Sequence, residues 1–288
     1  MTAMNGSVFD ARALPPAEAF AETSTWRHPA QLARNIVARG WTSTPSIQSG
    51  SMELFEAERV AAGVEVTGLP ARMANEAWGG ASNEAVRALV DEEPLSRIWY
   101  AAVGKDTSPD EILTLARLGA RAIVVEPFLF TAALQIDDPA VDPLYDVAQA
   151  LELPALVMIG GEYGDDISWC DPVRIERVAQ RFPRLDIVIV HAGWPSIQAT
   201  LAVAYRCPRV WLLPDVYFPG LPGQVDLVLA LRTFLRDRVI YGSGYPYCPH
   251  VQQLKAIRAL KLPEDIESAF LFDNAARLFG LPAATAPR

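Results

Sequence analysis

The stretch Ile187-Val188-Ile189-Val190-His191-Ala192-Gly193 is an unbroken apolar run that ends in a histidine and a glycine. Continuous runs of β-branched residues, in contrast to alternating ones, indicate strands buried on both faces, as in a parallel sheet covered by helices. Similar runs recur along the chain at fairly even spacing. We expect eight strands, at 7–12, 63–69, 97–103, 121–126, 154–160, 186–192, 209–215 and 238–244.

Helical patterns separate these runs. The segment from Ser108 to Gly119 has a serine N-cap, a proline at the first helical position and a terminal glycine, and Ser82-Asn83-Glu84 opens another helix. Further helices are expected near 51–62, 142–152, 172–182, 195–206, 223–236, 249–260 and 264–279. Strands that each precede a helix predict one (β/α)8 TIM barrel over residues 1–288, with a C-terminal helix. A doubly wound open sheet is less favoured, because no glycine-rich dinucleotide fingerprint follows the first strand.

Residues 13–50 interrupt this rhythm after the first strand. They are too many for an ordinary connection, and long insertions at the carboxyl end of a barrel strand often form active-site lids. The alternative is a surface excursion with its own short helix over Pro29–Arg39.

Composition excludes several classes of function. The net charge is −9, from 25 basic and 34 acidic residues, without a run of Lys or Arg, so a nucleic acid partner is not expected. Cys170, Cys207 and Cys248 are odd in number and share no CxxC spacing, which favours a reducing compartment. There is no signal-peptide pattern and no apolar run of membrane-spanning length, so we expect a cytoplasmic protein that acts on a small molecule. The apolar residues of 223–235 are interpreted as barrel packing, and a homodimer is left open.

Side chains at the carboxyl ends of barrel strands face the active site. The expected strand ends place there Asp10, Arg12, Arg72, Lys105, Glu126, Met158, Glu162, Tyr163, His191, Trp194, Asp215, Tyr217, Ser243, Tyr245, Tyr247, Cys248 and His250.

Several short motifs resemble the amidohydrolase-related family of metal-dependent barrels, a part of the amidohydrolase superfamily that includes decarboxylases, lactonases and hydratases of small organic acids. The matching stretches cover roughly residues 60–280. They are Leu118-Gly119-Ala120-Arg121-Ala122, Pro143-Leu144-Tyr145 with Leu151-Glu152-Leu153-Pro154, Val190-His191-Ala192-Gly193, Arg238-Val239-Ile240-Tyr241-Gly242-Ser243 and Asp273-Asn274-Ala275-Ala276-Arg277-Leu278.

The resemblance implies a divalent metal held by a strand-1 Asp-x-His-x-His, a strand-5 His and a strand-8 Asp. In this sequence those ligands fall at Arg12, Leu14, Met158 and Gly244, and only the strand-6 His191 matches. Arg offers no lone pair, and Leu, Met and Gly do not suit a zinc-like ion. We therefore expect no metal and no cofactor. A site rebuilt from His28, His191, His250 and Glu126 is the alternative.

Four residues are expected to carry the chemistry. His191 is the general acid/base, since its ordinary pKa lies near neutrality, although it could instead be a packed core histidine. Arg12 is the clamp for a carboxylate or oxyanion, unless a salt bridge to Asp10, Glu126 or Asp215 occupies it. Asp215 is expected to pair with His191, because consecutive barrel strands are neighbours, and Glu126 is the other candidate for an orienting or second acid/base group.

A further set is expected to bind substrate through aromatic walls and polar groups: Asp10, Trp26, His28, Tyr163, Trp194, Tyr217, Tyr245, Tyr247 and His250. Tyr245 could instead only pack. A nucleophilic Cys248 activated by His250 is less favoured, because near-adjacent loop residues rarely face each other.

Together these features predict a metal-independent amidohydrolase-like enzyme that uses acid/base chemistry on a small carboxylated or cyclic organic molecule. Hydrolysis, decarboxylation, elimination or hydration, and cyclisation all pass through anions that Arg12 could stabilise. A non-catalytic binding barrel and a metal hydrolase with relocated ligands are the alternatives. The former predicts a closed pocket with Arg12 in a salt bridge, and the enzyme predicts an open pocket with convergent polar groups.

Overall fold

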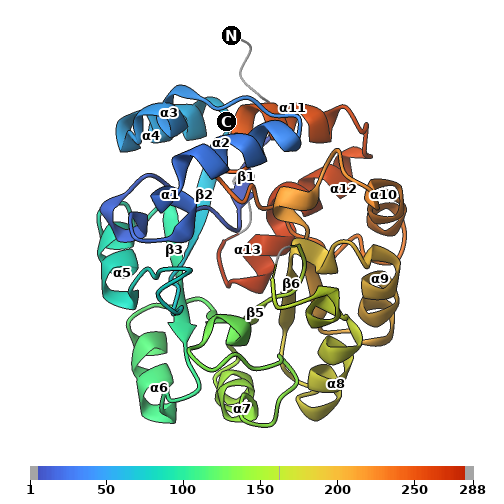
Figure 1. The fold of residues 1–288 in the computed structure, drawn as a ribbon. Helices are drawn as coiled ribbons and strands as arrows, with labels where there is room; N and C mark the ends of the chain where they lie inside the picture. The colour runs from blue at the N-terminus through green and yellow to red at the C-terminus, as the bar shows by residue number, and fades with distance from the viewer. Residues whose placement is uncertain (1–5, 162, 283–288) are drawn as a thin grey trace.

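The computed structural model describes residues 6–161 and 163–282, and its core is a parallel sheet that curls into a barrel (Figure 1). Neighbouring strands in the sheet are neighbours in sequence, and every pair is parallel. The strands are β1 (Val8–Asp10), β2 (Val64–Pro70), β3 (Arg97–Val103), β4 (Ile123–Val125), β5 (Ala155–Met158), β6 (Ile187–Val190) and β7 (Val210–Leu213).

Helices surround this sheet (Figure 1). Those that follow the barrel strands are α5 (Asn83–Asp91), α6 (Pro109–Arg117), α7 (Asp142–Ala150), α8 (Val173–Arg181), α9 (Ile197–Arg206), α10 (Gln224–Arg232) and α11 (His250–Arg258). The predicted start of α6 is confirmed, because Ser108 and Glu111 form a reciprocal capping box and Pro109 occupies the first turn. The chain then continues through α12 (Glu264–Ser268), a π-turn (Ala269–Asp273) and α13 (Asn274–Leu278).

The expected eighth strand at 238–244 does not form a regular strand. The segment is nevertheless bonded on both sides: Ile240 N–H donates to Leu212 of β7, and Ala11 N–H donates to Tyr241. Tyr241 N–H donates instead to Phe270 of the π-turn, which diverts the segment from a continuous ladder. The protein is thus a (β/α)8 barrel closed by an irregular extended segment.

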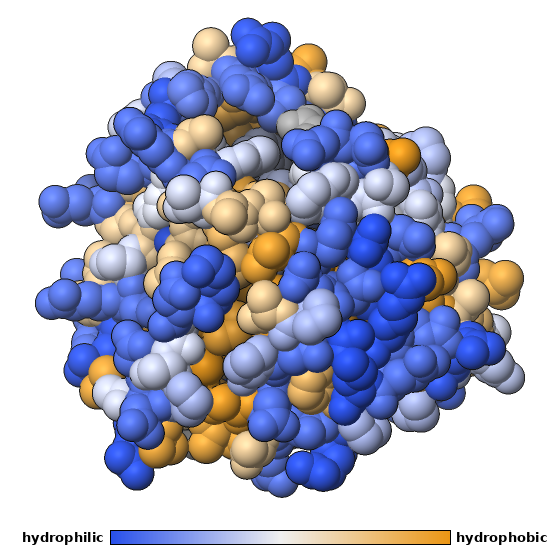
Figure 2. All heavy atoms as spheres, turned by 60° about the horizontal axis from the view of Figure 1, so that its bottom comes forward, coloured by the Kyte–Doolittle hydropathy of each residue, from blue (hydrophilic) through white to orange (hydrophobic). Residues whose placement is uncertain are grey.

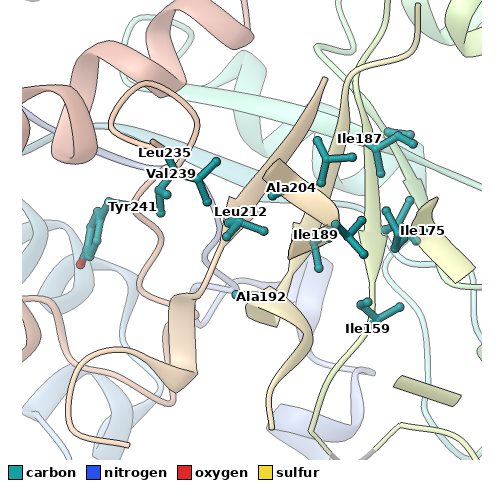
Figure 3. Packing of buried hydrophobic residues seen from close by; sticks show 14 of the residues in the cluster. Ile159, Ile175, Ile187, Ile189, Ala192, Ala204, Leu212, Leu235, Val239 and Tyr241 are labelled. Atoms are coloured by element: carbon teal, nitrogen blue, oxygen red, sulfur yellow. The ribbon is translucent and has the colours of Figure 1, made fainter. Parts of the chain in front are cut away.

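Alternate strand residues pack on opposite sides of the barrel wall. Ile187, Ile189 and Leu212 point outward against helix residues such as Ile175 and Ala204 (Figure 3). Their neighbours point inward into a separate cluster: Phe9, Ala11, Ile98, Tyr100, Ala122, Val124, Leu156, Met158, Val188, Val190, Trp211, Leu213 and Ile240. Burial of both faces explains why the strand sequences are apolar without interruption.

The inner cluster is closed at one end by the C-terminal helix. Phe272 and Phe279 pack against Phe9, with ring centroids 6.1 and 5.9 Å away, and Phe279 also lies 4.9 Å from the Tyr100 ring. The C-terminal segment therefore plugs the barrel at the end away from the carboxyl ends of the strands.

The 13–50 segment forms a cap of short helices: a 3₁₀ turn (Glu18–Phe20), α1 (Ser24–Arg27), α2 (Pro29–Ala38) and α3 (Pro45–Ser49), before α4 (Met52–Ala61). The predicted helix near Pro29–Arg39 is confirmed as α2. Ser24 N–H donates to Trp78, and Thr42 exchanges two hydrogen bonds with Gln252, so the segment is tied to both sides of the barrel mouth.

The interpretation of 223–235 as barrel packing is only partly right. Leu227 and Leu231 are buried, but Val225 is 79% and Leu229 62% exposed, because they lie on the outer face of α10. On the face in Figure 2, apolar side chains are likewise exposed between polar ones. Among the described residues, no helix is long and apolar enough to span a membrane.

We expect Phe279→Ala to lower the free energy of unfolding by about 3–5 kcal/mol, because it removes a fully buried ring from the barrel plug. Phe234→Ala is the matched control, since its ring is 41% exposed and should cost less. Urea denaturation of both variants measures the difference. Equal losses would contradict the assigned packing.

Candidate active site

The inward register of the strands continues past their carboxyl ends and brings charged residues together. Arg72, Glu126 and Asp215 each stand two residues beyond an inward-facing residue of a strand or its end. These inward-facing residues are Pro70, Val124 and Leu213, so the three charged side chains continue the inward rows. His191 directly follows β6, and Arg12 lies two residues beyond β1. All five residues are at least 93% buried.

A chain of contacts joins His191, Asp215 and Arg12. His191 Nδ1 lies 2.7 Å from Asp215 Oδ1, and Arg12 Nη1 donates to Asp215 Oδ2 at 3.1 Å. The Val216 backbone N–H donates to Asp215 Oδ1 at 2.6 Å. The expected contact between Asp215 and His191 is therefore present, and the expected alternative of a salt bridge from Arg12 to Asp215 is present as well.

The backbone is strained where it presents this pair. His191 has φ 68°, Ala192 φ 46° and Asp215 φ 32°, all in the left-handed region that residues with a Cβ rarely adopt. Such strain costs of order 1–3 kcal/mol per residue and concentrates at functional sites. The turns after β6 and β7 thus hold the imidazole and the carboxylate in one orientation.

Burial and charge set the protonation states of the pair. Burial lowers the pKa of His191 below 6.5, and the guanidinium groups of Arg12 and Arg39 act in the same direction, although Asp215 opposes them. Burial alone would raise the pKa of Asp215, but His191, Arg12 and the Val216 N–H together hold it below its ordinary value. His191 is therefore neutral at neutral pH. With Nδ1–H donated to the Asp215 carboxylate, its Nε2 keeps a lone pair.

A second buried ion pair lies beside the first. Arg72 Nε and Nη2 donate to the two oxygens of Glu126 at 3.2 and 3.0 Å. Burial alone would lower the pKa of Arg72, but Glu126 raises it above its ordinary value, so the guanidinium stays charged. Glu126 is accordingly held by Arg72 and does not contact His191 in any described bond.

A pocket opens above these pairs. Its cavity volume is about 50 Å³ and it opens to solvent, and the barrel contributes Arg12, Arg72, Trp78, Tyr163, His191, Val216, Tyr217 and Tyr247 to its wall. The 13–50 segment adds Ser24, Thr25, Asn35 and Arg39. Burial raises the pKa of Tyr163 to about 12, so its hydroxyl stays protonated beside the imidazole, whose ring stacks on it at 5.5 Å.

Several predicted substrate-binding residues do not line this pocket. Asp10 is fully buried, where it accepts hydrogen bonds from Ser243 and contacts His250 Nε2 at 2.7 Å. Tyr245 stacks on His250, and its hydroxyl contacts the Ser46 hydroxyl. Its position therefore agrees with the alternative expectation that Tyr245 is a packing residue. This buried cluster links the start of α11 to the end of β1.

His28 is exposed between α1 and α2, and Trp26 Nε1 is bonded to the Leu14 carbonyl. Trp194 donates to Pro222 and stacks behind Tyr217 at 4.7 Å, so it supports the wall without lining it. All three therefore lie outside the wall of this pocket, where the sequence had placed them, because the sequence does not show which way loop side chains turn.

The less favoured nucleophile Cys248 is also placed elsewhere. It is buried, burial raises the pKa of its thiol well above the ordinary value, and its Sγ faces the Val216 carbonyl while His250 faces Asp10. Glu162 lies outside the described residues. Lys105 is exposed and pairs with Asp106, outside the pocket wall.

The pocket includes Arg39, which the sequence-based site missed, and Arg72, which the expected strand ends placed at the site without a catalytic or binding role. Arg72 stands two residues past Pro70 on the inward row of β2. Arg39, Asn35 and Thr25 gave no such signal, since they come from the 13–50 segment, whose approach to the mouth depends on tertiary packing.

The residues at the family's metal positions do not fit a metal ion. Arg12 presents a cation, and Leu14 and Met158 line an apolar space below it with Leu156 and Val190. A Cβ at Gly244 would lie 2.3 Å from Val216 Cγ1, so Val216 fills the space that an acidic side chain there would need. Within the described residues, no group of three or more His, Cys, Asp or Glu side chains is arranged to hold a metal.

Comparison with known proteins agrees with this architecture. The sequence model of the amidohydrolase family matches residues 49–281, well over half of the chain. This chain belongs to the amidohydrolase family. A solved structure of an uncharacterized TIM-barrel protein from Bordetella bronchiseptica is 30% identical, with a TM-score of 0.90 over 95% of this chain and 98% of that chain.

More distant structures share the fold. They include 5-carboxyvanillate decarboxylase from Sphingomonas paucimobilis (17% identity, TM-score 0.68, 96% of this chain and 99% of that chain). They also include 2,6-dihydroxybenzoate decarboxylase from Rhizobium (15% identity, TM-score 0.68, 96% and 99%). No curated protein matches this chain.

The charges around His191 predict opposite pKa shifts in two variants. Asp215→Asn removes the anion that raises the pKa of His191, so that pKa should fall further, whereas Arg12→Met removes a cation that lowers it, so the pKa should rise. NMR titration of the imidazole signals measures both, with His191→Asn identifying the resonance. Shifts of the same sign in the two variants would contradict the described contacts.

Proposed function

We propose that this amidohydrolase-family protein is an acid/base enzyme that acts on a small organic acid without a metal. The observation that supports this most directly is the Arg12–Asp215–His191 chain at the wall of an open pocket. It provides a neutral imidazole for proton transfer, an oriented carboxylate behind it and a guanidinium beside it.

In the proposed mechanism, His191 Nε2 accepts a proton from the substrate or from a water molecule and later returns it. Asp215 stays ionised, fixes the imidazole tautomer and stabilises the imidazolium that forms. Arg12 and Arg72 stabilise negative charge that develops on a substrate oxygen, and because both are held by carboxylates they need no reorganisation at that moment. In this proposal, the Arg12 guanidinium provides the electrostatic stabilisation that a metal ion would otherwise provide.

A non-catalytic barrel is the second candidate, because Arg12 is engaged in the salt bridge that this alternative predicts. The two candidates differ in turnover. Suitable test compounds are 2,6-dihydroxybenzoate and 5-carboxyvanillate, which the names of the distant structural relatives suggest, and the simple lactone dihydrocoumarin.

We expect His191→Asn to lower kcat on the substrate turned over fastest by about 10²–10⁴, because the proton-transfer group is lost. His28→Asn, the same change at an exposed position, should keep wild-type turnover. In the wild type, kcat/KM should rise with pH through a pKa below 6.5 and then level off, since the base must be unprotonated. Unchanged turnover in His191→Asn would reject the mechanism, and binding without turnover would favour the non-catalytic barrel.

Metal independence has its own test. Purified protein should contain substoichiometric zinc and manganese by elemental analysis, and dialysis against EDTA should leave both turnover and thermal stability unchanged. One tightly held ion per chain, with activity lost on its removal and restored on its return, would show relocated ligands instead.

A further inference from the structure

The charges in the pocket are unevenly balanced. Arg12 is neutralised by Asp215 and Arg72 by Glu126, both within 3.2 Å. Arg39, directly after α2, also lines the pocket, yet no described carboxylate lies within salt-bridge distance of it. Among the described residues of the wall none is Asp or Glu. Among the described residues, the positive charge of Arg39 therefore has no carboxylate partner.

The contacts that hold Arg39 in the described part of the chain are aromatic rings and a backbone carbonyl. Its guanidinium carbon lies 5.6 Å from the Tyr217 ring centroid and 5.4 Å from that of Tyr247, and its Nη1 donates to the Asn35 carbonyl at 3.0 Å. Its Nε is buried and has no hydrogen-bond acceptor. A buried N–H without an acceptor is costly, so its presence beside an open pocket points to an acceptor that a ligand brings.

We propose, on the basis of the function proposed above, that Arg39 binds a permanent anionic group of the substrate, and that the group which reacts beside His191 is neutral. The substrate class is then a monoanion: a carboxylate at one end, and at the other a carbonyl of a ketone, ester or lactone. A second full negative charge at the floor would meet arginines that Asp215 and Glu126 already neutralise.

The aromatic side chains define the space between the two ends. Tyr217 stands edge-on to His191, with centroids 5.3 Å apart, and the same ring faces Arg39. Tyr163 stacks on the imidazole, and its ring centroid lies 5.4 Å from that of Trp78. A flat ligand body fits walls of this kind, because aromatic faces favour stacked or edge contacts with planar groups.

Three matched probes test the proposal by isothermal titration calorimetry: 4-acetylbenzoate, a monoanion with a ketone; methyl 4-acetylbenzoate, its neutral ester; and terephthalate, a dianion of similar shape. We expect the wild type to bind 4-acetylbenzoate most tightly. Arg39→Met should weaken that binding by about tenfold or more, as expected for loss of a charge-assisted hydrogen bond, and leave the ester unaffected. Arg39→Lys should recover part of the loss.

Arg34→Met, on the exposed side of α2, is the control and should bind like the wild type. Unchanged affinity in Arg39→Met, tighter binding of terephthalate than of 4-acetylbenzoate, or no binding of 4-acetylbenzoate at millimolar concentration would each overturn the proposal. In His191→Asn, Arg39 is unchanged, so the preference for 4-acetylbenzoate over its methyl ester should remain. Turnover of this variant tests the acid/base mechanism, whereas the preference between the two probes tests Arg39, so either proposal can fail while the other stands.

Discussion

The buried carboxylate of Asp215 organises the site, because its three hydrogen-bond partners fix the positions of the strand ends around it. Its oxygens contact His191 Nδ1, Arg12 Nη1 and the Val216 N–H, which come from the turn after β6, the segment after β1 and its own turn. A buried carboxylate without such partners would be expensive, so each contact constrains where the three backbone segments lie. The strained φ values of His191 and Asp215 persist because these contacts over-determine the geometry.

The departures from the family's metal pattern form one connected change. Arg12 occupies a ligand position and is bonded to Asp215, while Val216 fills the space beside Gly244. Leu14 and Met158 make the floor below apolar. Under the proposed function, the guanidinium of Arg12 takes the place of a bound metal cation, and its hydrogen bonds are directional whereas the field of a metal ion is not.

The fold and the site could be predicted from the sequence to different degrees, depending on whether a residue belongs to a strand, a helix or a loop. The strand and helix order followed from continuous apolar runs and from caps such as Ser108-Pro109, because those signals are local. The pairing of Asp215 with His191 followed from strand adjacency. By contrast, Asp10, Tyr245 and His250 were expected at the pocket and form a buried cluster, since the sequence of a loop does not show whether its side chains turn inward or outward.

Periodicity and residue type were enough to predict the barrel, its family and the absence of the usual ligands at Arg12, Leu14, Met158 and Gly244. Tertiary contacts were needed to show that Arg12 and Arg72 are each paired with a carboxylate, while Arg39 has no such partner among the described residues. The two kinds of information differ in the sequence separation over which they act. Apolar periodicity acts over a few residues, whereas the charge balance of the pocket depends on contacts between Arg12 and Asp215, 203 positions apart, and on how residues 13–50 fold across the mouth.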